Sequence, residues 1–360
     1  MSVVLGVGGL LLIALVAYDV FQSVVLPRPA VGRIRLSIRA IKILWTVWGR
    51  AAGMIRSVPR REAALASFAP GAVLVFLFIW AMGFVLGYAM VLDALPNDIQ
   101  PPHPGLGGAL YTSALSLFTL GFGGVVPVGA AARAVVISEA AIGVGMIALV
   151  ISLLFSLFSS FQRRETLVVT LDASAGAPPS GIALLESHAR FAMTDHLEQT
   201  FDEWKHWTAD VLESHLAYPI LIYFRSSHDN EAWINSFGAV MDAAALVITA
   251  VDGAAKGPAH LFFKVGRHLV EDLSWYFRIP ASGPPGVEQE DFEAARERLA
   301  DIGYHLREGS AAWEDFAALR VQYAPALGRL AARLMVPPAP WLGDRSYAPH
   351  SEADRAPASR

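Results

Sequence analysis

The chain has 360 residues, of which 54% are hydrophobic and only 17% are charged, and its mean hydropathy is +0.44. This composition is too apolar for an ordinary soluble protein. Charged residues are nearly absent from three long stretches before residue 162 and ordinary in frequency after it, which predicts a membrane domain joined to a soluble one. Cysteine is absent, which excludes disulfides, thiolate metal sites and thiol nucleophiles. The net charge is −4, and the basic residues cluster beside apolar segments, which indicates membrane topology and not nucleic-acid binding.

Three segments are long and apolar enough to cross a bilayer as helices, because a hydrocarbon core of about 30 Å requires roughly 20 apolar residues. They are residues 3–26, residues 63–92 and residues 140–162. A cleaved signal peptide is the alternative interpretation of the first segment. We favour a span, because the segment lacks a basic beginning and a clear small-residue cleavage site, and because arginines follow it directly.

The loop between the first two spans determines the expected orientation. It contains nine basic residues and one acid, Glu62, whereas residues 93–105 contain two Asp and no Lys or Arg. Positive charge favours the cytoplasmic side, so we expect a multi-pass protein of the cell (inner) membrane with the N-terminus outside and the C-terminal half cytoplasmic. The nine basic residues are Arg28, Arg33, Arg35, Arg39, Lys42, Arg50, Arg56, Arg60 and Arg61.

Within this loop, residues 34–50 have a pattern that predicts a helix lying on the membrane surface. One face carries Arg35, Arg39 and Lys42, and another carries Ile34, Ile38, Ile41 and Trp45. Trp45 and Trp48 suit the headgroup region. A solvated basic linker is the alternative, although the apolar positions keep a helical period.

Residues 106–128 carry the pattern that is most informative about function. Residues 107–118 predict a short helix, and Thr119, Leu120, Gly121, Phe122 and Gly123 follow it. An ion that enters a pore loses its water shell, and rings of backbone carbonyls from several subunits can replace the lost oxygens. Successive carbonyls point the same way only if the backbone alternates between right- and left-handed conformations, which glycine tolerates. We therefore predict that these five residues bind the permeant ion, with a tight glycine turn in a re-entrant loop as the alternative.

Thr119, Gly121, Phe122 and Gly123 fit the motif T-x-G-[Y/F]-G, and over residues 65–162 the chain resembles the potassium-channel family. The order of parts is similar too, with an outer helix, a pore helix, a filter and an inner helix. The resemblance implies an all-α membrane fold, potassium as the permeant ion and four chains around one pore.

The resemblance also suggests roles for residues around the filter. Gly143, nineteen residues after Gly124, stands where simple bacterial potassium channels carry a gating-hinge glycine, and Tyr111 takes a commonly aromatic pore-helix position that would support the filter. The chain departs from the family at Gly124, which replaces the usual Asp, and at Leu115, where some members place a carboxylate. Both departures remove hydrogen bonds that would brace the filter. A non-selective cation channel and a non-conducting membrane-anchored sensor or scaffold therefore stay open as alternatives.

Two acids and a run of large apolar residues in the spans require an explanation. Glu139 lies four residues before Gly143, where a charge is costly, and we expect it to brace the pore helix and support the filter. The alternatives are that it binds cations near the pore or only forms a hydrogen bond with a neighbouring hydroxyl. Asp19 lies near the expected cytoplasmic edge, where we expect it to pair with Arg28 or a neighbour. Leu and Phe residues between 149 and 161 form either a hydrophobic gate or ordinary packing and lipid contacts.

The second half of the chain predicts a cytoplasmic all-α bundle. Residues 167–172 have the composition of a short strand, residues 173–181 and 280–286 predict breaks, and residues after 343 predict a disordered tail. This half resembles bacterial proteins that join an ion-channel domain to a helical region of unassigned role. That resemblance implies no functional residues.

Histidine and carboxylate residues recur at helical spacing in this half, as in His206 and Asp210, Glu213 and His215, and His268 and Glu271. Such pairs form metal sites in some bundles, but no repeated E-x-x-H motif accompanies them, so we expect no metal. The chain has no phosphate-binding, G-x-S-x-G or H-E-x-x-H motif, which argues against an enzyme.

The sequence thus predicts four parts. Residues 1–62 form a transmembrane helix and an interfacial helix, residues 63–165 a pore domain, residues 166–342 a cytoplasmic helical domain and residues 343–360 a disordered tail. The expected function is K+ conduction through a homotetramer that is gated by the inner helix and modulated by the cytoplasmic domain. A domain that serves only for assembly or partner binding is the alternative. Membrane lipids and K+ are the expected partners, and neither a cofactor nor nucleic acid is expected. The sequence does not identify the gating stimulus or a regulatory ligand.

Overall fold

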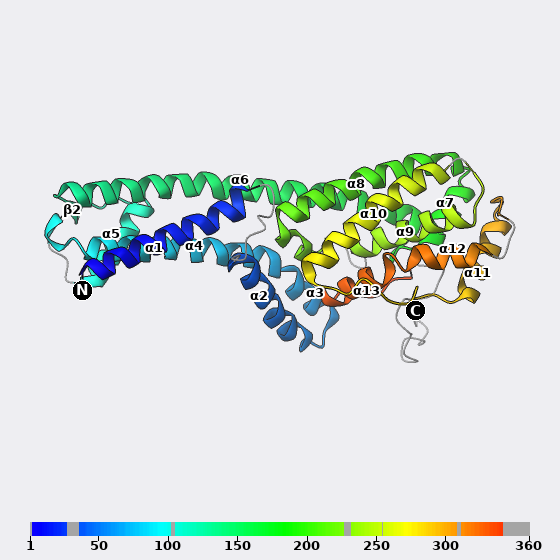
Figure 1. Cartoon of the computed structure of the whole chain (residues 1–360), viewed down its shortest axis with the longest axis horizontal. Coiled ribbons are helices and arrows are strands. Elements are labelled where there is room, and N and C mark those ends of the chain that lie inside the picture. The colour runs from blue at the N-terminus through cyan, green and yellow to red at the C-terminus, as the bar shows by residue number, and fades with distance from the viewer. Residues whose placement is uncertain are drawn as a thin grey trace. The chain divides into compact units, whose positions relative to one another are not determined.

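The computed structural model describes residues 2–26, 36–101, 105–226, 232–253, 255–307 and 311–340 (Figure 1). The predicted tail lies outside these residues. The chain divides into two compact units. The membrane unit comprises Met1–Ser159 and Leu216–Phe224, and the helical unit comprises Ser160–His215 and Arg225–Arg360.

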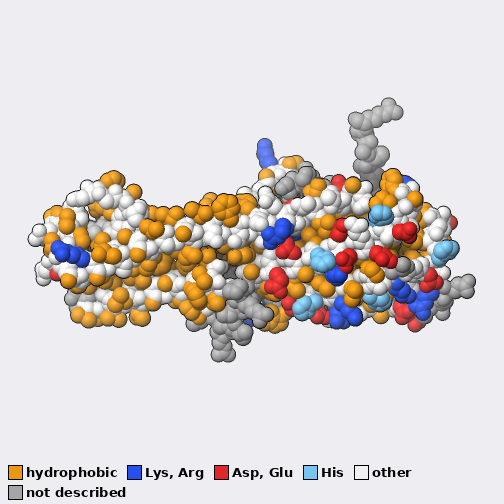
Figure 2. All heavy atoms as spheres, turned by 90° about the horizontal axis from the view of Figure 1, so that it is seen from above, with side chains coloured by type: hydrophobic (Ala, Val, Ile, Leu, Met, Phe, Trp, Pro, Cys, Tyr) orange, Lys and Arg blue, Asp and Glu red, His pale blue; other side chains and the backbone are white. Residues whose placement is uncertain are grey.

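The membrane unit is built from helices, and three of them are long and apolar enough to cross a membrane. These three confirm the predicted spans by length and composition, although the second is divided at Ser67 into α3 and α4. Hydrophobic side chains dominate the surface of this unit, whereas charged side chains and histidines gather on the helical unit (Figure 2). The elements are α1 (Ser2–Val20) with a π-helical turn (Phe21–Val25), α2 (Leu36–Gly53), α3 (Val58–Ala66), α4 (Phe68–Asp93), β1 (Ile99–Gln100), α5 (Gly105–Leu117), β2 (Val126–Pro127) and the first part of α6 (Ala130–Ala175).

Glycines allow α1 to approach α4 closely. A Cβ atom added to Gly9 would lie 2.5 Å from the carbonyl oxygen of Gly87, and one added to Gly83 would lie 2.7 Å from a methyl group of Val16. Small residues at such crossings allow two membrane helices to pack backbone against backbone. The N-terminal helix α1 is therefore closely fitted to α4.

Asp19 has a hydrogen-bond partner on α4 that the sequence did not predict. Its Oδ2 atom accepts a hydrogen bond of 2.9 Å from Nε1 of Trp80 on α4, and Arg28 lies outside the described residues. An indole N–H is a donor without charge, so this bond gives the carboxylate a neutral partner in the α1–α4 packing, and the expected pairing with Arg28 stays a prediction.

α2 confirms the predicted helix in the basic loop, but the predicted environment of Trp45 is wrong. Trp45 is 6% exposed, and its ring packs against Phe68 and Tyr223 at centroid distances of 4.9 and 5.0 Å. Trp48 donates a hydrogen bond of 2.8 Å from Nε1 to the carbonyl oxygen of Ala64, which joins α2 to α3. An aromatic ring gains most from burial, and here protein, not the headgroup layer, provides it.

The helical unit confirms the predicted all-α bundle and is organised around α9. Every residue of α9 is buried, and α7, α10, α12 and α13 pack against it. Its helices are the last part of α6, α7 (Gly181–Arg190), α8 (Leu197–Ala217, whose last two residues belong to the membrane unit), α9 (Trp233–Thr249), α10 (Lys256–Phe277), α11 (Gln289–Asp301), α12 (Ala311–Arg320) and α13 (Ala324–Arg333).

A buried ion pair fixes α12 against the centre of α9. Nη1 of Arg320 donates to Oδ1 of Asp242 over 2.9 Å, and both side chains are fully buried. The hydroxyl of Tyr323 donates to the same oxygen, and Nε of Arg320 donates to the carbonyl oxygen of Pro285 in the predicted break at 280–286. Burial raises the pKa of Asp242 to about 6, despite the opposing effect of Arg320.

The predicted strand at residues 167–172 is wrong, because α6 continues as one helix to Ala175. The hydroxyl of Thr166 donates to the carbonyl oxygen of Gln162 over 2.9 Å, and Val168 and Leu171 are buried, so packing overrides the strand-like composition. The helix ends where Gly176 adopts a left-handed conformation with φ of +78°. The predicted domain boundary at residues 165 and 166 falls inside this helix.

Candidate ion pathway

The short helix α5 ends in a Schellman motif. The amide of Leu120 donates to the carbonyl oxygen of Leu115 over 2.9 Å, and the amide of Thr119 donates to that of Ser116 over 3.1 Å. Thr119 takes the left-handed position with φ of +53°, which is unusual for a residue other than glycine. The last residue of α5 is therefore Leu117, and one residue separates it from Thr119, the first residue of the T-x-G-F-G segment. The predicted end of the helix was residue 118.

The T-x-G-F-G segment has positive φ angles at alternate positions. They are +53° at Thr119, +58° at Gly121 and +74° at Gly123, whereas Leu120, Phe122 and Gly124 have none. This is the conformation that alignment of successive carbonyls requires. A Cβ added to Gly121 or Gly123 would meet no atom within 4 Å, so the need for glycine arises from the backbone and not from crowding.

A two-stranded ladder holds the chain beyond this segment. β1 pairs antiparallel with β2, with Gln100 opposite Val126, and the amide of Val128 donates to the carbonyl oxygen of Asp98 over 2.8 Å. Arg133 at the beginning of α6 donates from Nε to the carbonyl oxygen of Pro127 over 3.2 Å. The segment is thus anchored by a helix end on one side and by backbone pairing on the other.

Behind the segment, Glu139 of α6 contacts the pore-helix candidate α5. Ser113 Oγ lies 2.5 Å from Oε1 of Glu139 and 2.8 Å from the carbonyl oxygen of Val85 on α4. Glu139 and Ser113 are fully buried. Three helices therefore meet at one hydroxyl group, which is the geometry that a brace requires. Ser113 was not singled out in the sequence, since a lone serine in an apolar helix gives no signal of its partner.

We expect Ser113→Ala to destabilise the protein by about 1–3 kcal/mol per chain, because the Glu139 carboxyl then loses its buried partner. The measurement is thermal unfolding of the purified protein in detergent. Ser116→Ala is the matched control, since the Ser116 hydroxyl donates only within its own helix, to Thr112 over 2.9 Å. Equal losses in the two variants would contradict a bracing role for Ser113 and Glu139.

Tyr111 and Leu115 are less buried than Glu139. The side chain of Tyr111 is 53% exposed in the single chain, and that of Leu115 is partly buried. Support of the filter by Tyr111 stays a prediction that depends on neighbouring subunits.

Gly143 lies where α6 passes the end of α5. It is buried, and a Cβ atom at this position would collide with the carbonyl oxygen of Leu117, the last residue of α5. A Cβ atom added to Gly145, two residues further along α6, would meet no atom within 4 Å. The close approach gives Gly143 a packing reason to be glycine, while its role as a gating hinge stays a prediction.

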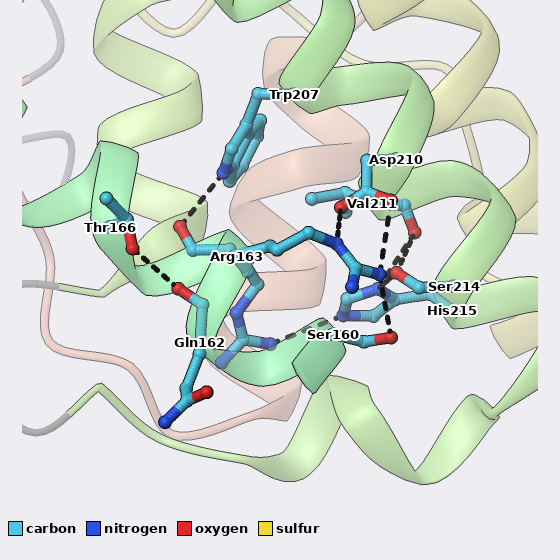
Figure 3. A network of polar contacts seen from close by, with 10 residues as sticks. Ser160, Gln162, Arg163, Thr166, Trp207, Asp210, Val211, Ser214 and His215 are labelled. Atoms are coloured by element: carbon cyan, nitrogen blue, oxygen red, sulfur yellow. Dashed lines mark hydrogen bonds and ion pairs between the residues drawn. The ribbon is translucent and has the colours of Figure 1, made fainter. Parts of the chain in front are cut away.

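Two arginines fix the end of α6 that follows the apolar span to α8, and Figure 3 shows the first of them, Arg163, beside Asp210. Arg163 donates from Nε to Oδ2 of Asp210 over 3.0 Å at the surface. Arg164 is 2% exposed and lies 3.3 Å from Nε2 of His215, and Nε1 of Trp207 donates to the Arg164 carbonyl oxygen over 2.9 Å. The contacts join both the side chains and the backbone of α6 to α8.

The tautomer of His215 follows from its partners. Nδ1 of His215 lies 2.8 Å from the carbonyl oxygen of Val211 and donates to it, so Nε2 is left as the acceptor for Arg164. Burial and the positive charge of Arg164 lower the pKa of His215 to about 3. The ring is therefore neutral at physiological pH.

We expect His215→Gln to weaken the acid sensitivity of folding. Between pH 6.5 and about pH 3 the unfolded chain binds a proton at His215 that the folded chain does not. The contribution of His215 to the free energy of unfolding is therefore complete above pH 6.5. It decreases by about 1.4 kcal/mol for each pH unit below that value. Thermal unfolding at pH 6 and pH 4 measures this slope. His206→Gln is the control, because the His206 side chain is 72% exposed. An unchanged slope in His215→Gln would contradict the neutral, buried histidine.

The histidine–carboxylate pairs do not assemble into metal-ligand clusters where the structure describes them. In that part of the chain no group of three or more His, Asp or Glu side chains is placed to hold a metal ion. Asp210 and His215 are engaged by Arg163 and Arg164, and His268 lies 3.6 Å from Asp272. The expectation that no metal is bound stays a prediction.

Comparison with known proteins bears on the membrane unit. Residues 72–160 match the model of a family described as ion channel. This match supports an ion channel. It covers most of α4, all of α5, the T-x-G-F-G segment and α6 as far as Ser160, so the geometry described above lies within the matched residues, apart from the α6–α8 contacts. No curated protein matches the chain, and no solved structure does.

Proposed function

We propose that this chain is one subunit of a tetrameric, potassium-selective channel of the cell membrane. The observation that carries the proposal is the alternation of positive φ angles at Thr119, Gly121 and Gly123, within a T-x-G-F-G motif that follows a short helix between two spans. In an ion-channel domain, this backbone presents carbonyl oxygens in series. The Thr119 hydroxyl adds an oxygen at the inner end.

The single chain leaves surfaces exposed that a tetramer would cover or turn toward a pore. Leu120 and Phe122 are 52% and 71% exposed, although both lie in an apolar segment. One filter strand per chain requires several chains for a ring of carbonyls, and the family resemblance sets the number at four.

An exposed row along α6 supports its role as the inner helix. The row consists of small residues until Phe155, which is 75% exposed. Four copies of Phe155 around an axis would form a hydrophobic constriction that closes by dewetting. The small residues are Ala134, Ser138, Ala141, Gly145, Ala148 and Ser152.

The proposed orientation places the N-terminus outside and the α2–α3 turn in the cytoplasm, because of the nine-to-one excess of basic residues in that loop. Because the chain has no cysteine, a cysteine introduced at one position is the only thiol that a maleimide can label. In right-side-out vesicles we expect an impermeant maleimide to label Pro101→Cys and not Ser57→Cys. Labelling of Ser57→Cys from outside would reverse the orientation.

The helical unit is proposed to modulate the pore and to carry no enzymatic activity or cofactor. α6 is one unbroken helix from the ion-channel domain to Ala175, and Arg163 and Arg164 fix its second part to α8. A change in the α6–α8 contacts can therefore bias the inner helix between two states.

Ion flux into liposomes tests the proposal against its alternatives. We expect the reconstituted protein to admit K+ and Rb+ and to exclude Na+. Equal uptake of Na+ and K+ would favour a non-selective cation channel. The residues Leu115 and Gly124 favour this alternative, because they lack the hydrogen bonds that would brace the filter. No uptake of any cation by an intact tetramer would favour the membrane-anchored scaffold.

A further inference from the structure

The hairpin of α2, residues 54–57 and α3 presents an exposed row that the ion pathway does not use. Ile43, Val47 and Arg50 follow one another at helical spacing on α2, and Met54 continues the row at the turn. Ile43 is 64% exposed, Val47 61% and Met54 79%. Three large apolar side chains in one row are costly in water.

The opposite face of the hairpin is already covered by protein. Trp45 and Ala52, seven residues apart on α2, are buried, and Trp45 packs against Phe68 of α4 and Tyr223. The Trp48 hydrogen bond to Ala64 fixes α3 beside α2. The row at Ile43 is therefore exposed on the other side of α2 from Trp45, and protein covers the Trp45 side, which the sequence suggested for membrane contact.

Cations adjoin this row. Arg50 lies within it, Arg56 lies in the turn and Arg60 lies on α3, and all three are exposed. Within the part of the chain that the structure describes, none of the three forms an ion pair with a carboxylate. An aliphatic row next to free guanidinium groups fits a boundary between hydrocarbon and phosphate, since guanidinium binds phosphate oxygens in pairs.

We propose that this face of the hairpin binds anionic phospholipids of the membrane surface. Ile43, Val47 and Met54 enter the acyl boundary, and Arg50, Arg56 and Arg60 hold the headgroup phosphates. The proposal goes beyond ion conduction and does not depend on potassium selectivity, so it stands even for a non-selective channel.

The site has a route to the pore domain within the membrane unit. Trp45 joins the hairpin to Phe68, the first residue of the outer helix α4, and to Tyr223 of the 3-10 turn Pro219–Tyr223. Lipid that holds the hairpin in place therefore also holds the beginning of α4.

The test uses the full chain, reconstituted in phosphatidylcholine liposomes that contain one-fifth brominated phosphatidylglycerol or one-fifth brominated phosphatidylcholine. A bimane fluorophore is attached to Val47→Cys, and bromine quenches it on contact. Leu11→Cys, an exposed position on the apolar helix α1, is the lipid control, and Glu314→Cys, an exposed position on α12, is the aqueous control. The same Val47→Cys protein is also made with Arg50, Arg56 and Arg60 changed to Gln.

We expect both brominated lipids to quench Val47→Cys, with phosphatidylglycerol about threefold more effective because each arginine near the surface attracts anionic lipid. Leu11→Cys should show no preference, and the three Gln substitutions should remove the preference at Val47→Cys while quenching persists. Quenching no greater than at Glu314→Cys would overturn the proposal and indicate that water or a second copy covers the face. Equal quenching by the two lipids, or a preference that survives the Gln substitutions, would overturn the assignment of the arginines.

Discussion

Gly121→Ala should abolish potassium conduction and leave the assembled protein intact. Gly121 has a φ of +58°, and an alanine in the left-handed region costs roughly 1–2 kcal/mol per chain, or about 4–8 kcal/mol for four chains. The chain would relieve this strain by rotating a peptide group, which removes carbonyl oxygens from the ion path. We expect K+ uptake into liposomes to fall below about one-tenth of the wild-type rate, since 1.4 kcal/mol already corresponds to tenfold.

Gly124→Ala is the matched control for this experiment. Gly124 has no positive φ in the left-handed range and no atom within 4 Å of an added Cβ, so alanine should fit without strain. Retained flux in Gly124→Ala with lost flux in Gly121→Ala would locate the requirement in the backbone conformation. Wild-type flux in an intact Gly121→Ala tetramer would reject the filter assignment.

Gly143→Ala should both destabilise the protein and reduce conduction. The added methyl group would collide with the carbonyl oxygen of Leu117, two residues before Thr119, so α5 or α6 must move and displace the beginning of the T-x-G-F-G segment. Overpacking of a close contact of this kind typically costs about 1–3 kcal/mol per chain. Thermal unfolding in detergent and K+ flux measure the two effects.

Gly145→Ala is the control that distinguishes the effect of crowding at Gly143 from the effect of a stiffer α6. Both substitutions stiffen α6 in the same way, but a Cβ at position 145 would meet nothing within 4 Å. The packing account predicts near wild-type stability for Gly145→Ala and a clear loss for Gly143→Ala. A Gly143→Ala protein with unchanged stability and altered open probability alone would show instead that the residue acts as a hinge.

The sequence predicted the parts of the candidate ion pathway whose structure depends on adjacent residues. The apolar runs predicted the three spans, and the motif predicted glycine where Gly121 and Gly123 adopt positive φ, because both signals are contained in a few adjacent residues. The left-handed angle at Thr119 was not predicted for that residue, since it depends on how α5 ends.

Contacts between distant residues could not be predicted in the same way. Ser113 and Glu139 are 26 positions apart, and nothing in either helix alone indicates that they meet. Trp45 was expected in the headgroup layer, but Phe68 and Tyr223 bury it, because a tryptophan suits a protein core as well as a membrane surface. The strand at 167–172 failed for a related reason, since packing against the helical unit maintains the helix.

The reversal potential under bi-ionic conditions tests the central claim most directly. With equal concentrations of K+ on one side and Na+ on the other, single-channel or bulk currents through the reconstituted protein give the permeability ratio. A potassium-selective pore predicts a shift toward the potassium potential of at least about 59 mV, which corresponds to a tenfold preference for a monovalent ion. A reversal potential near zero would contradict potassium selectivity, whatever the backbone conformation at Thr119, Gly121 and Gly123.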